Sequence, residues 1–399
     1  MTLSDLSHGA TVTSRRRDRV LTHGRGCLHA LTAPGPGPWR TWLEVNGLDE
    51  ATLALLSEHN LQYYLFYRLQ EVGLPGGLPQ EQVARLLSAY VYSVASAEKR
   101  LIEHARVLRV LRQAGIVPVV FKGAALASTA YPDPACRPMD DLDLWVLPEE
   151  LVRASATLQA AGYAAPAGTE RSPAWLASQR GEVQLFAPPP DRYLVELHAS
   201  PFAGEWLCRA TAIDEAGIRS RVVPIAIAGE RCLTLAPEDA LIQLATHFAI
   251  NHQFAFIWLR ALLDIVLLAR SSPLDWEAVT EHARSWRVAT VIATVLELAN
   301  DLFGLEEAGR AQAKLAPGSI RRRLLKLFVS PEAIVFRRDL RAYPLRRVVQ
   351  LLLVDRPQDG ARLIWRGLWP EDEWLAERYG QSGQRSRREY LSSMLRARP

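Results

Sequence analysis

The fold of this chain is decided by two stretches, Val119-Val120-Phe121-Lys122-Gly123-Ala124 and Asp141-Leu142-Asp143-Leu144-Trp145-Val146. The first predicts a short apolar strand, which a Lys-Gly turn joins to a helix. Prolines at positions 132, 134 and 138 exclude a regular helix from the connection that follows. The second predicts another strand, and because side chains alternate along a strand, Asp141 and Asp143 share one face while the leucines point into a core.

The two aspartates on one face of the sheet indicate a metal ion. Two like charges side by side disfavour the doubly ionised state, and a bound divalent cation is the usual compensation. The alternative is an exposed sheet face with solvated acids, because an Asp-x-Asp pair by itself is a weak signal. Asp140 adjoins the pair but points to the opposite face, so we expect a surface role for it.

A third carboxylate is expected from a neighbouring strand. In Val195-Glu196-Leu197, the alternation places Glu196 on the polar face of a buried strand, which makes it the predicted third metal ligand. His198 shares that face, and three roles are open for it: general base, phosphate contact, or hydrogen-bond partner of Glu196.

The turn after the first strand has the features of a phosphate site. Gly123 lets the backbone approach a phosphate closely, and the helix that follows offers free N–H groups at its N-terminus. Lys122 can neutralise phosphate charge, and Arg137 can clamp a phosphate with two hydrogen bonds. The structural alternatives are an ordinary strand-to-helix turn, a surface lysine, and an arginine that holds its loop by pairing with Asp133 or Asp140.

These residues resemble the motifs of the nucleotidyltransferase superfamily that includes DNA polymerase beta. The closer likeness is to a branch of uncharacterised nucleotidyltransferase-like proteins from bacterial biosynthetic gene clusters, lasso-peptide clusters among them. That branch has a Lys-Gly turn, a Tyr, an Arg and an Asp-x-Asp strand, which here are Lys122-Gly123, Tyr131, Arg137 and Asp141-Leu142-Asp143. Later matches are Glu196-Leu197-His198, Pro237-Glu238-Asp239 to His247, Leu259 to Asp264, and Leu368-Trp369-Pro370 with Trp374 and Arg378-Tyr379-Gly380. The superfamily's usual Gly-Ser is Gly123-Ala124 here, which removes a hydroxyl that can touch a phosphate.

The resemblance implies a magnesium-dependent enzyme of the two-metal type that moves a nucleotidyl group from an NTP to a hydroxyl, amine or phosphate of a peptide or small-metabolite acceptor. Asp141, Asp143 and Glu196 would hold the metal, with His198 as a further catalytic residue. Lys122, Gly123 and Arg137 would bind the phosphates. Two alternatives stay open: a kinase that uses the same metal site, and a catalytically degenerate scaffold that acts with a partner in a biosynthetic complex.

The composition is that of an ordinary globular protein, with 49% hydrophobic and 23% charged residues among 399. A net charge of +4 is too small to indicate nucleic-acid binding, and the Arg runs at 15–17 and 321–323 predict a loose tail and solvated helix faces. The four cysteines form no Cys-x-x-Cys pair, so neither a zinc site nor disulfides are expected. No apolar run reaches the roughly 20 residues of a membrane span, and the first residues lack a signal-peptide pattern, so we expect a cytoplasmic protein.

The expected fold class is α+β, with a small mixed sheet, N-terminal helices and a larger C-terminal helical unit. Residues 1–38, rich in Ser, Arg, Gly and Pro, predict a flexible tail. Residues 39–114 predict N-terminal helices, 115–230 the catalytic core, and 231–399 the C-terminal helical domain. Inside the core, 183–186 and 193–198 predict a hairpin, and 221–227 an edge strand because it contains Pro224. We expect nucleotide and acceptor in the cleft between the sheet and the helical unit.

In the C-terminal half, helices are predicted at 237–250, 253–270, 275–300 and 318–329. His247 and Asn251 lie on one face of the first of these, where packing is expected rather than metal binding. Asp264 is expected to pair with Arg260 or to reach the cleft. Three tryptophans near the end are predicted core anchors: Trp365, Trp369 and Trp374.

Overall fold

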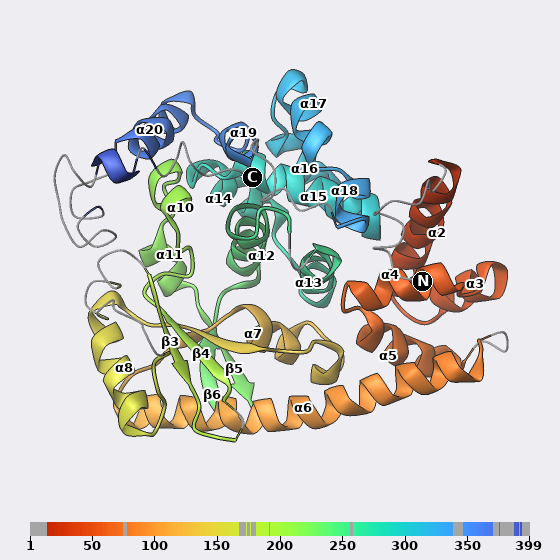
Figure 1. Ribbon diagram of the computed structural model, residues 1–399, viewed down its shortest axis with the longest axis horizontal. Helices are drawn as coiled ribbons and strands as arrows, with labels where there is room; N and C mark the ends of the chain where they lie inside the picture. The colour runs from red at the N-terminus through yellow and green to blue at the C-terminus, as the bar shows by residue number, and fades with distance from the viewer. Residues whose placement is uncertain are drawn as a thin grey trace.

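The structure, a computed structural model, describes residues 14–74, 78–166, 173, 176, 181–190, 192–255, 258–337, 346–369, 375, 387–390 and 392. It confirms the predicted α+β class, with one six-stranded mixed sheet, helices before it and a larger helical region after it (Figure 1). Pro370, Trp374 and residues 378–380, which contributed to the resemblance, lie outside the described residues.

The N-terminal region begins with a helix where the sequence predicts a tail. The helices before the sheet are α2 (Ser14–Thr32), α3 (Gly37–Asn46), α4 (Glu50–Glu58), α5 (Gln62–Val72) and α6 (Gln80–Gln113). The prediction of a flexible tail is therefore wrong for residues 14–32, while 1–13 lie outside the described residues. Cys27, Leu28 and Leu31 of α2 are fully buried. Their helical spacing provides an apolar stripe that the Arg- and Gly-rich composition around them conceals.

The sheet has the order β3-β4-β2-β1-β6-β5. Its strands are β1 (Val119–Val120), β2 (Asp141–Trp145), β3 (Glu182–Phe186), β4 (Leu194–His198), β5 (Val223–Ile227) and β6 (Glu230–Thr234). The predicted β3–β4 hairpin is confirmed as an antiparallel pair, and β5 is an edge strand as expected. The sequence analysis missed β6, which pairs in parallel with β1 and so joins the β5–β6 hairpin to the rest of the sheet.

The two faces of the sheet differ in character. Leu142, Leu144, Val195 and Leu197 point toward α6 and α8 (Leu151–Ala160), and they share a core cluster with apolar side chains of these two helices. Because side chains alternate, Asp143 and Glu196 point to the other face. In Figure 1, α6 runs below the sheet, and α12 (Pro237–Thr246) and α13 (Trp258–Ser271) lie above it.

The remaining described elements, in chain order, are helices. They are α7 (Lys122–Thr129), η1 (Pro134–Cys136), η2 (Pro148–Glu150), α10 (Glu205–Ala210), α11 (Glu215–Ser220), the π-helix η3 (His247–Asn251), α14 (Trp276–Ser285), α15 (Ala289–Phe303), η4 (Glu306–Ala308), α16 (Gly309–Leu315), α17 (Ser319–Phe328), α18 (Pro331–Val335), α19 (Arg346–Leu352) and α20 (Pro357–Leu368). A second core cluster runs without interruption from α2 and α5 through α12, α13 and α15. The N-terminal and C-terminal helices are thus packed on one another.

Two predictions for the helical region are wrong. The helix predicted at 275–300 is two helices, α14 and α15, because Arg287 takes a left-handed backbone conformation with φ of 62°. The Asp355 carboxylate then caps α15 by accepting hydrogen bonds from the N–H groups of Ala289 and Thr290. Trp365 and Trp369, predicted as core anchors, are 63% and 50% exposed.

Candidate functional site

The predicted acidic residues meet because β2 and β4 pair in parallel. The register places Asp143 opposite Glu196 and Trp145 opposite His198. Potential metal-binding atoms of Asp143, Glu196 and His198 all lie within 4.8 Å of one another. The sheet therefore brings together residues more than fifty positions apart in the sequence, as the sequence analysis expects.

Lys122 completes the charge arrangement from the turn after β1. Its ammonium group lies 2.7 Å from Asp143 Oδ1, and the imidazole Nε2 of His198 lies 2.9 Å from the same oxygen. Lys122 has φ of 53°, a left-handed conformation that is uncommon for a residue with a side chain and is often found at functional sites. The positive φ of this turn thus belongs to Lys122 and not to Gly123.

His198 is surrounded by carboxylates. Besides Asp143, its Nε2 lies 3.5 Å from Glu196 Oε2, and its Nδ1 lies 3.4 Å from Glu182 Oε2. Gln184 donates a hydrogen bond of 2.9 Å to Glu196 Oε1. Glu182 and Gln184 on β3 were missed in the sequence, although the alternation Glu182-Val183-Gln184-Leu185 follows the same pattern that identified Glu196.

The electrostatics of the cluster follow from burial and from these charges. Burial by itself raises the pKa of Asp143, but Lys122 and His198 hold that pKa well below its usual range. Burial and the negative charges of Asp143 and Glu196 raise the pKa of Asp141 to about 7. Burial and Lys122 lower the pKa of His198, yet its hydrogen bonds to Asp143 and Glu196 prevail and raise it to about 9. In this arrangement the imidazole is protonated at neutral pH, which suits a phosphate contact better than a general base.

The third role left open for His198 in the sequence, a hydrogen-bond partner of Glu196, is consistent with these contacts. Asp141 lies on the same strand and face as Asp143 but does not belong to the group of three that lies within 4.8 Å. Its main-chain carbonyl accepts a hydrogen bond from the hydroxyl of Tyr193, which in turn contacts His104 Nε2 at 2.7 Å. These contacts fix the start of β2 beside β4.

Arg137 has a different partner from those expected. Its Nε and Nη2 donate to the two oxygens of Asp264 at 3.1 and 2.9 Å, and Nη1 donates to the carbonyl of Pro138. Tyr131 donates to Asp264 as well, at 2.7 Å. Of the alternatives left open for these residues, the structure shows neither Asp133 nor Asp140 as the partner of Arg137; Asp264 holds Arg137 and also interacts electrostatically with Arg260. Phosphate binding by Arg137 stays a prediction, because its fork is occupied by Asp264 here.

Gly123 is required by this same arginine. A Cβ built on Gly123 would lie 2.8 Å from Arg137 Nη1, closer than non-bonded atoms approach one another. The glycine thus makes room for the guanidinium group at the start of α7. Its predicted approach to a phosphate is not tested by this contact.

His247 lies close enough to the cluster to interact with the charges of Lys122, Asp143 and His198. It begins the π-helix η3 and is half-buried, and its ring packs edge-on against His252 at 4.4 Å between centroids. Burial and the nearby positive charge of Lys122 hold the pKa of His247 well below its usual range. π-Helical turns occur often at functional sites. The sequence analysis assigned His247 to packing, since a π-turn has no clear signal in the sequence.

The residues present fit a divalent cation. The donor set of Asp143, Glu196 and His198 offers two carboxylates and one imidazole within 4.8 Å, and Asp141 adds a further carboxylate on the same face. Oxygen ligands suit magnesium, whereas the imidazole of His198 would have to lose its proton before it could bind a metal ion. His198 therefore lies next to two of the three predicted metal ligands, Asp143 and Glu196.

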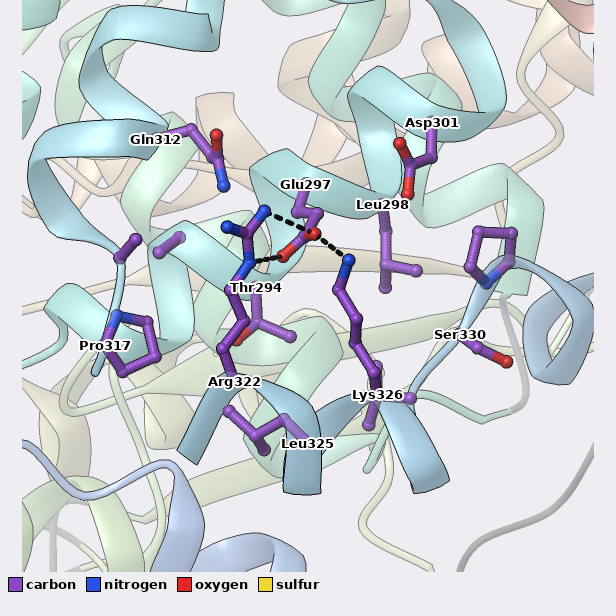
Figure 2. A pocket seen from close by; sticks show the side chains of 14 residues that line it. Thr294, Glu297, Leu298, Asp301, Gln312, Pro317, Arg322, Leu325, Lys326 and Ser330 are labelled. Atoms are coloured by element: carbon purple, nitrogen blue, oxygen red, sulfur yellow. Dashed lines mark hydrogen bonds and ion pairs between the residues drawn. The ribbon is translucent and has the colours of Figure 1, made fainter. Parts of the chain in front are cut away.

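A pocket lies away from this cluster, against α15 and α17, and one of its two acids, Glu297, is neutralised within the protein. Figure 2 shows Glu297 between two basic side chains, with Arg322 at 2.7 Å and Lys326 at 2.5 Å. Arg321 donates to the carbonyl of Val354. The Arg run at 321–323, predicted to be solvated, thus contributes at least two structural contacts. These contacts weaken the idea that this run follows a nucleic-acid backbone.

Comparison with known proteins identifies the family of the chain. The family model described as "Uncharacterised nucleotidyltransferase" matches residues 48–304, which include every element of the cluster. Among solved structures, the chain is similar to an antigenic nucleotidyltransferase-like protein from Paracoccidioides brasiliensis, with 14% identity and a TM-score of 0.33 over 57% of this chain and 96% of that chain. A likeness this low supports no statement about the site. No curated protein matches the chain. Among the described residues, no helix is long and apolar enough to cross a membrane.

Proposed function

The chain belongs to the uncharacterised nucleotidyltransferase family, and we propose that it transfers a nucleotidyl group from an NTP to a hydroxyl, amine or phosphate of a peptide or small-metabolite acceptor. The observation that carries this proposal is the parallel pairing of β2 with β4, which sets Asp143 beside Glu196. The resemblance to the superfamily of DNA polymerase beta and to proteins of biosynthetic clusters supports the choice of reaction. The acceptor class rests on that resemblance alone.

Asp141, Asp143 and Glu196 would hold magnesium, which supplies charge neutralisation on the triphosphate and activation of the acceptor. In the reaction, the acceptor's oxygen or nitrogen forms a bond to the α-phosphorus and gives up its proton to solvent water. The bond between the α-phosphorus and the bridging oxygen breaks, and pyrophosphate leaves with the electron pair. Lys122 and the protonated His198 are both held by Asp143 here. Once the phosphates draw these two cations away from Asp143, both can contact the phosphates.

The turn at Lys122 and Gly123 supports the placement of the phosphates. The first N–H groups of α7 have no partner inside the helix and carry partial positive charge. Ala124 stands where the superfamily has a serine, so the backbone N–H groups and Lys122 would bind the phosphates without that hydroxyl.

Calorimetry of each NTP, with and without magnesium, tests the proposal. We expect wild-type protein to bind at least one NTP only when magnesium is present, and Asp143→Asn to bind it at least ~100-fold more weakly, because a metal ligand is lost. Asp140→Asn is the matched control, since Asp140 is an exposed neighbour of the pair. A folded wild-type protein that binds no NTP would contradict the proposal and favour a scaffold that acts within a biosynthetic complex.

The mass of the product separates nucleotidyl transfer from phosphoryl transfer. A nucleoside monophosphate added to the acceptor, with release of pyrophosphate, agrees with the proposal. An added phosphate alone would show that the same site works as a kinase.

A further inference from the structure

A groove of about 360 Å³ opens between α10, η3, α19 and α20. Figure 1 shows α10, α19 and α20 together at the upper left of the molecule. Trp206, Ile250, Leu351, Leu363 and Leu368 form much of its apolar lining. Pockets for small ligands have volumes of about 300–1,000 Å³ and combine apolar walls with a few polar groups. This groove has the size and the lining of a ligand pocket.

Two segments of the chain lead from the candidate site to this groove. The loop after His198 reaches the groove at Gly204, and the π-helix that begins with His247 reaches it at Ile250 and Asn251. A rise of about 1.5 Å per helical residue places Asn251 no more than about 6 Å along the helix from His247. Asn251 also donates to the carbonyl of Ala203 at 3.0 Å, which ties the two segments together. Two short segments of the chain therefore connect the candidate site with the groove.

The charge of the groove restricts what it can hold. Of the described residues that line it, Arg347 carries the only charge. Its Nη1 lies 3.5 Å from the neutral amide oxygen of Gln350, and within the described part of the chain no carboxylate forms an ion pair with it. An arginine beside apolar walls favours a carboxylate, a phosphate or another anion, which it can bind with two hydrogen bonds.

We propose that this groove binds the acceptor, and that the acceptor is an apolar molecule with one anionic group. Its apolar part lies against Trp206 and Leu363, and its anion pairs with Arg347. The atom that receives the nucleotidyl group then extends past Asn251 toward the carboxylates. This inference rests on the proposed function, since it assigns the groove to the second substrate of that reaction.

A photoreactive dodecanoate that carries a diazirine tests the groove, and the corresponding dodecanol tests the need for the anion. Crosslinks are located by mass spectrometry of peptides. We expect the dodecanoate to label the segments 204–206, 347–351 and 363–368, and the alcohol to label them at least ~10-fold less. Labelling in other segments, or equal labelling by acid and alcohol, would overturn the proposal.

Two variants with matched controls test the contacts. Arg347→Gln removes the cation, and Ile364→Glu adds a negative charge to a groove residue that is 50% exposed. Each should lower dodecanoate labelling at least ~10-fold. The controls are Arg323→Gln and Ile320→Glu, both exposed on α17 and away from the groove, and they should label like the wild type. Equal effects in variants and controls would contradict the assignment.

NTP calorimetry on the wild-type protein separates this inference from the proposed function. NTP binding without labelling of the groove would overturn the acceptor groove alone. Labelling of the groove without any NTP binding would overturn the nucleotidyl transfer and, with it, the assignment of the groove to an acceptor.

Discussion

Asp143 Oδ1 is the point where three parts of the chain meet. It accepts from Lys122 after β1 and contacts His198 at the end of β4. Lys122 is held in a left-handed conformation that costs about 1–3 kcal/mol. The ion pair with a buried carboxylate is the contact that keeps the lysine there. Such strain, together with a cluster of acids, is typical of a site that binds a charged ligand.

Gly123→Ala tests the close contact with Arg137. The added methyl would lie 2.8 Å from Nη1, and relieving this overlap should lower the free energy of unfolding by about 1–3 kcal/mol. Gly309→Ala is the matched control, because it lies at the start of α16 with nothing within 4 Å of its Cβ position. Urea denaturation measures both. If the two variants are equally stable, Gly123 is not required by packing.

The burial of His59 makes the stability of the protein depend on pH. Its ring Nε2 lies 3.0 Å from the carbonyl of Val335, and burial is the main cause that lowers its pKa from 6.5 to about 4. Between these two pH values the unfolded chain binds a proton that the folded chain does not, so the free energy of unfolding falls as the pH falls. The loss from this group should reach about 3 kcal/mol near pH 4 and be absent above pH 7.

Urea denaturation of His59→Gln between pH 7 and pH 4 measures this loss. Glutamine keeps a hydrogen-bond donor but does not titrate, so the variant should lose less stability than the wild type over this range. Parallel pH profiles in the two proteins would show that His59 is not the group responsible.

The connection between α7 and β2 is held in place by α13. Asp264 on α13 binds both Arg137 and Tyr131, and all three side chains are largely buried. The family resemblance rests in part on these residues, through Tyr131, Arg137 and the later match from Leu259 to Asp264. It did not show that they contact one another, because the partner lies more than a hundred residues away.

Asp264→Asn should be strongly destabilising. It leaves the Arg137 charge buried without its carboxylate, which typically costs about 3–5 kcal/mol. Tyr131→Phe removes one neutral donor and should cost about 1 kcal/mol. Glu150→Gln is the control, since it breaks an exposed pair with Arg153 and should cost less than about 1 kcal/mol. Thermal denaturation orders the three variants, and a small effect of Asp264→Asn would contradict this role.

The molecule as a whole is joined by one core that includes its first described helix. Arg25 of α2 donates to the carbonyl of Asp301, and Arg270 of α13 contacts the carbonyl of Thr32. The apolar stripe of α2 packs into the same core cluster as α13 and α15. The division of the chain at 38, 114 and 230 remains a prediction, although β6 crosses the last of these positions.

Deleting residues 1–32 should therefore lower stability relative to a protein that lacks only residues 1–13, because the first deletion also removes α2. Cys27, Leu28 and Leu31 are fully buried, and each buried aliphatic side chain contributes about 1.5–3 kcal/mol. Calorimetric unfolding of the two truncated proteins measures the difference. Equal transition temperatures would support the tail that the composition predicts.

Local patterns along the chain were enough to predict several elements and the faces on which their side chains lie. Period-two alternation in β2 and β4 placed Asp143 and Glu196 on polar faces, and α6 lies within the region 39–114 that was predicted to be helical. The resemblance correctly indicated the family. The pattern failed where composition masked an apolar stripe, as in α2, and at β6, which begins with the charged residues Glu230 and Arg231.

Tertiary structure alone decided which of these residues meet. The parallel register of β2 and β4, the three acids around His198, the pairing of Arg137 with Asp264 and the groove beside Asn251 all join residues far apart in the chain. Alternation along a strand determines the face on which a side chain lies. The neighbouring strand and helix determine its partner, and that choice depends on the packing of the whole chain.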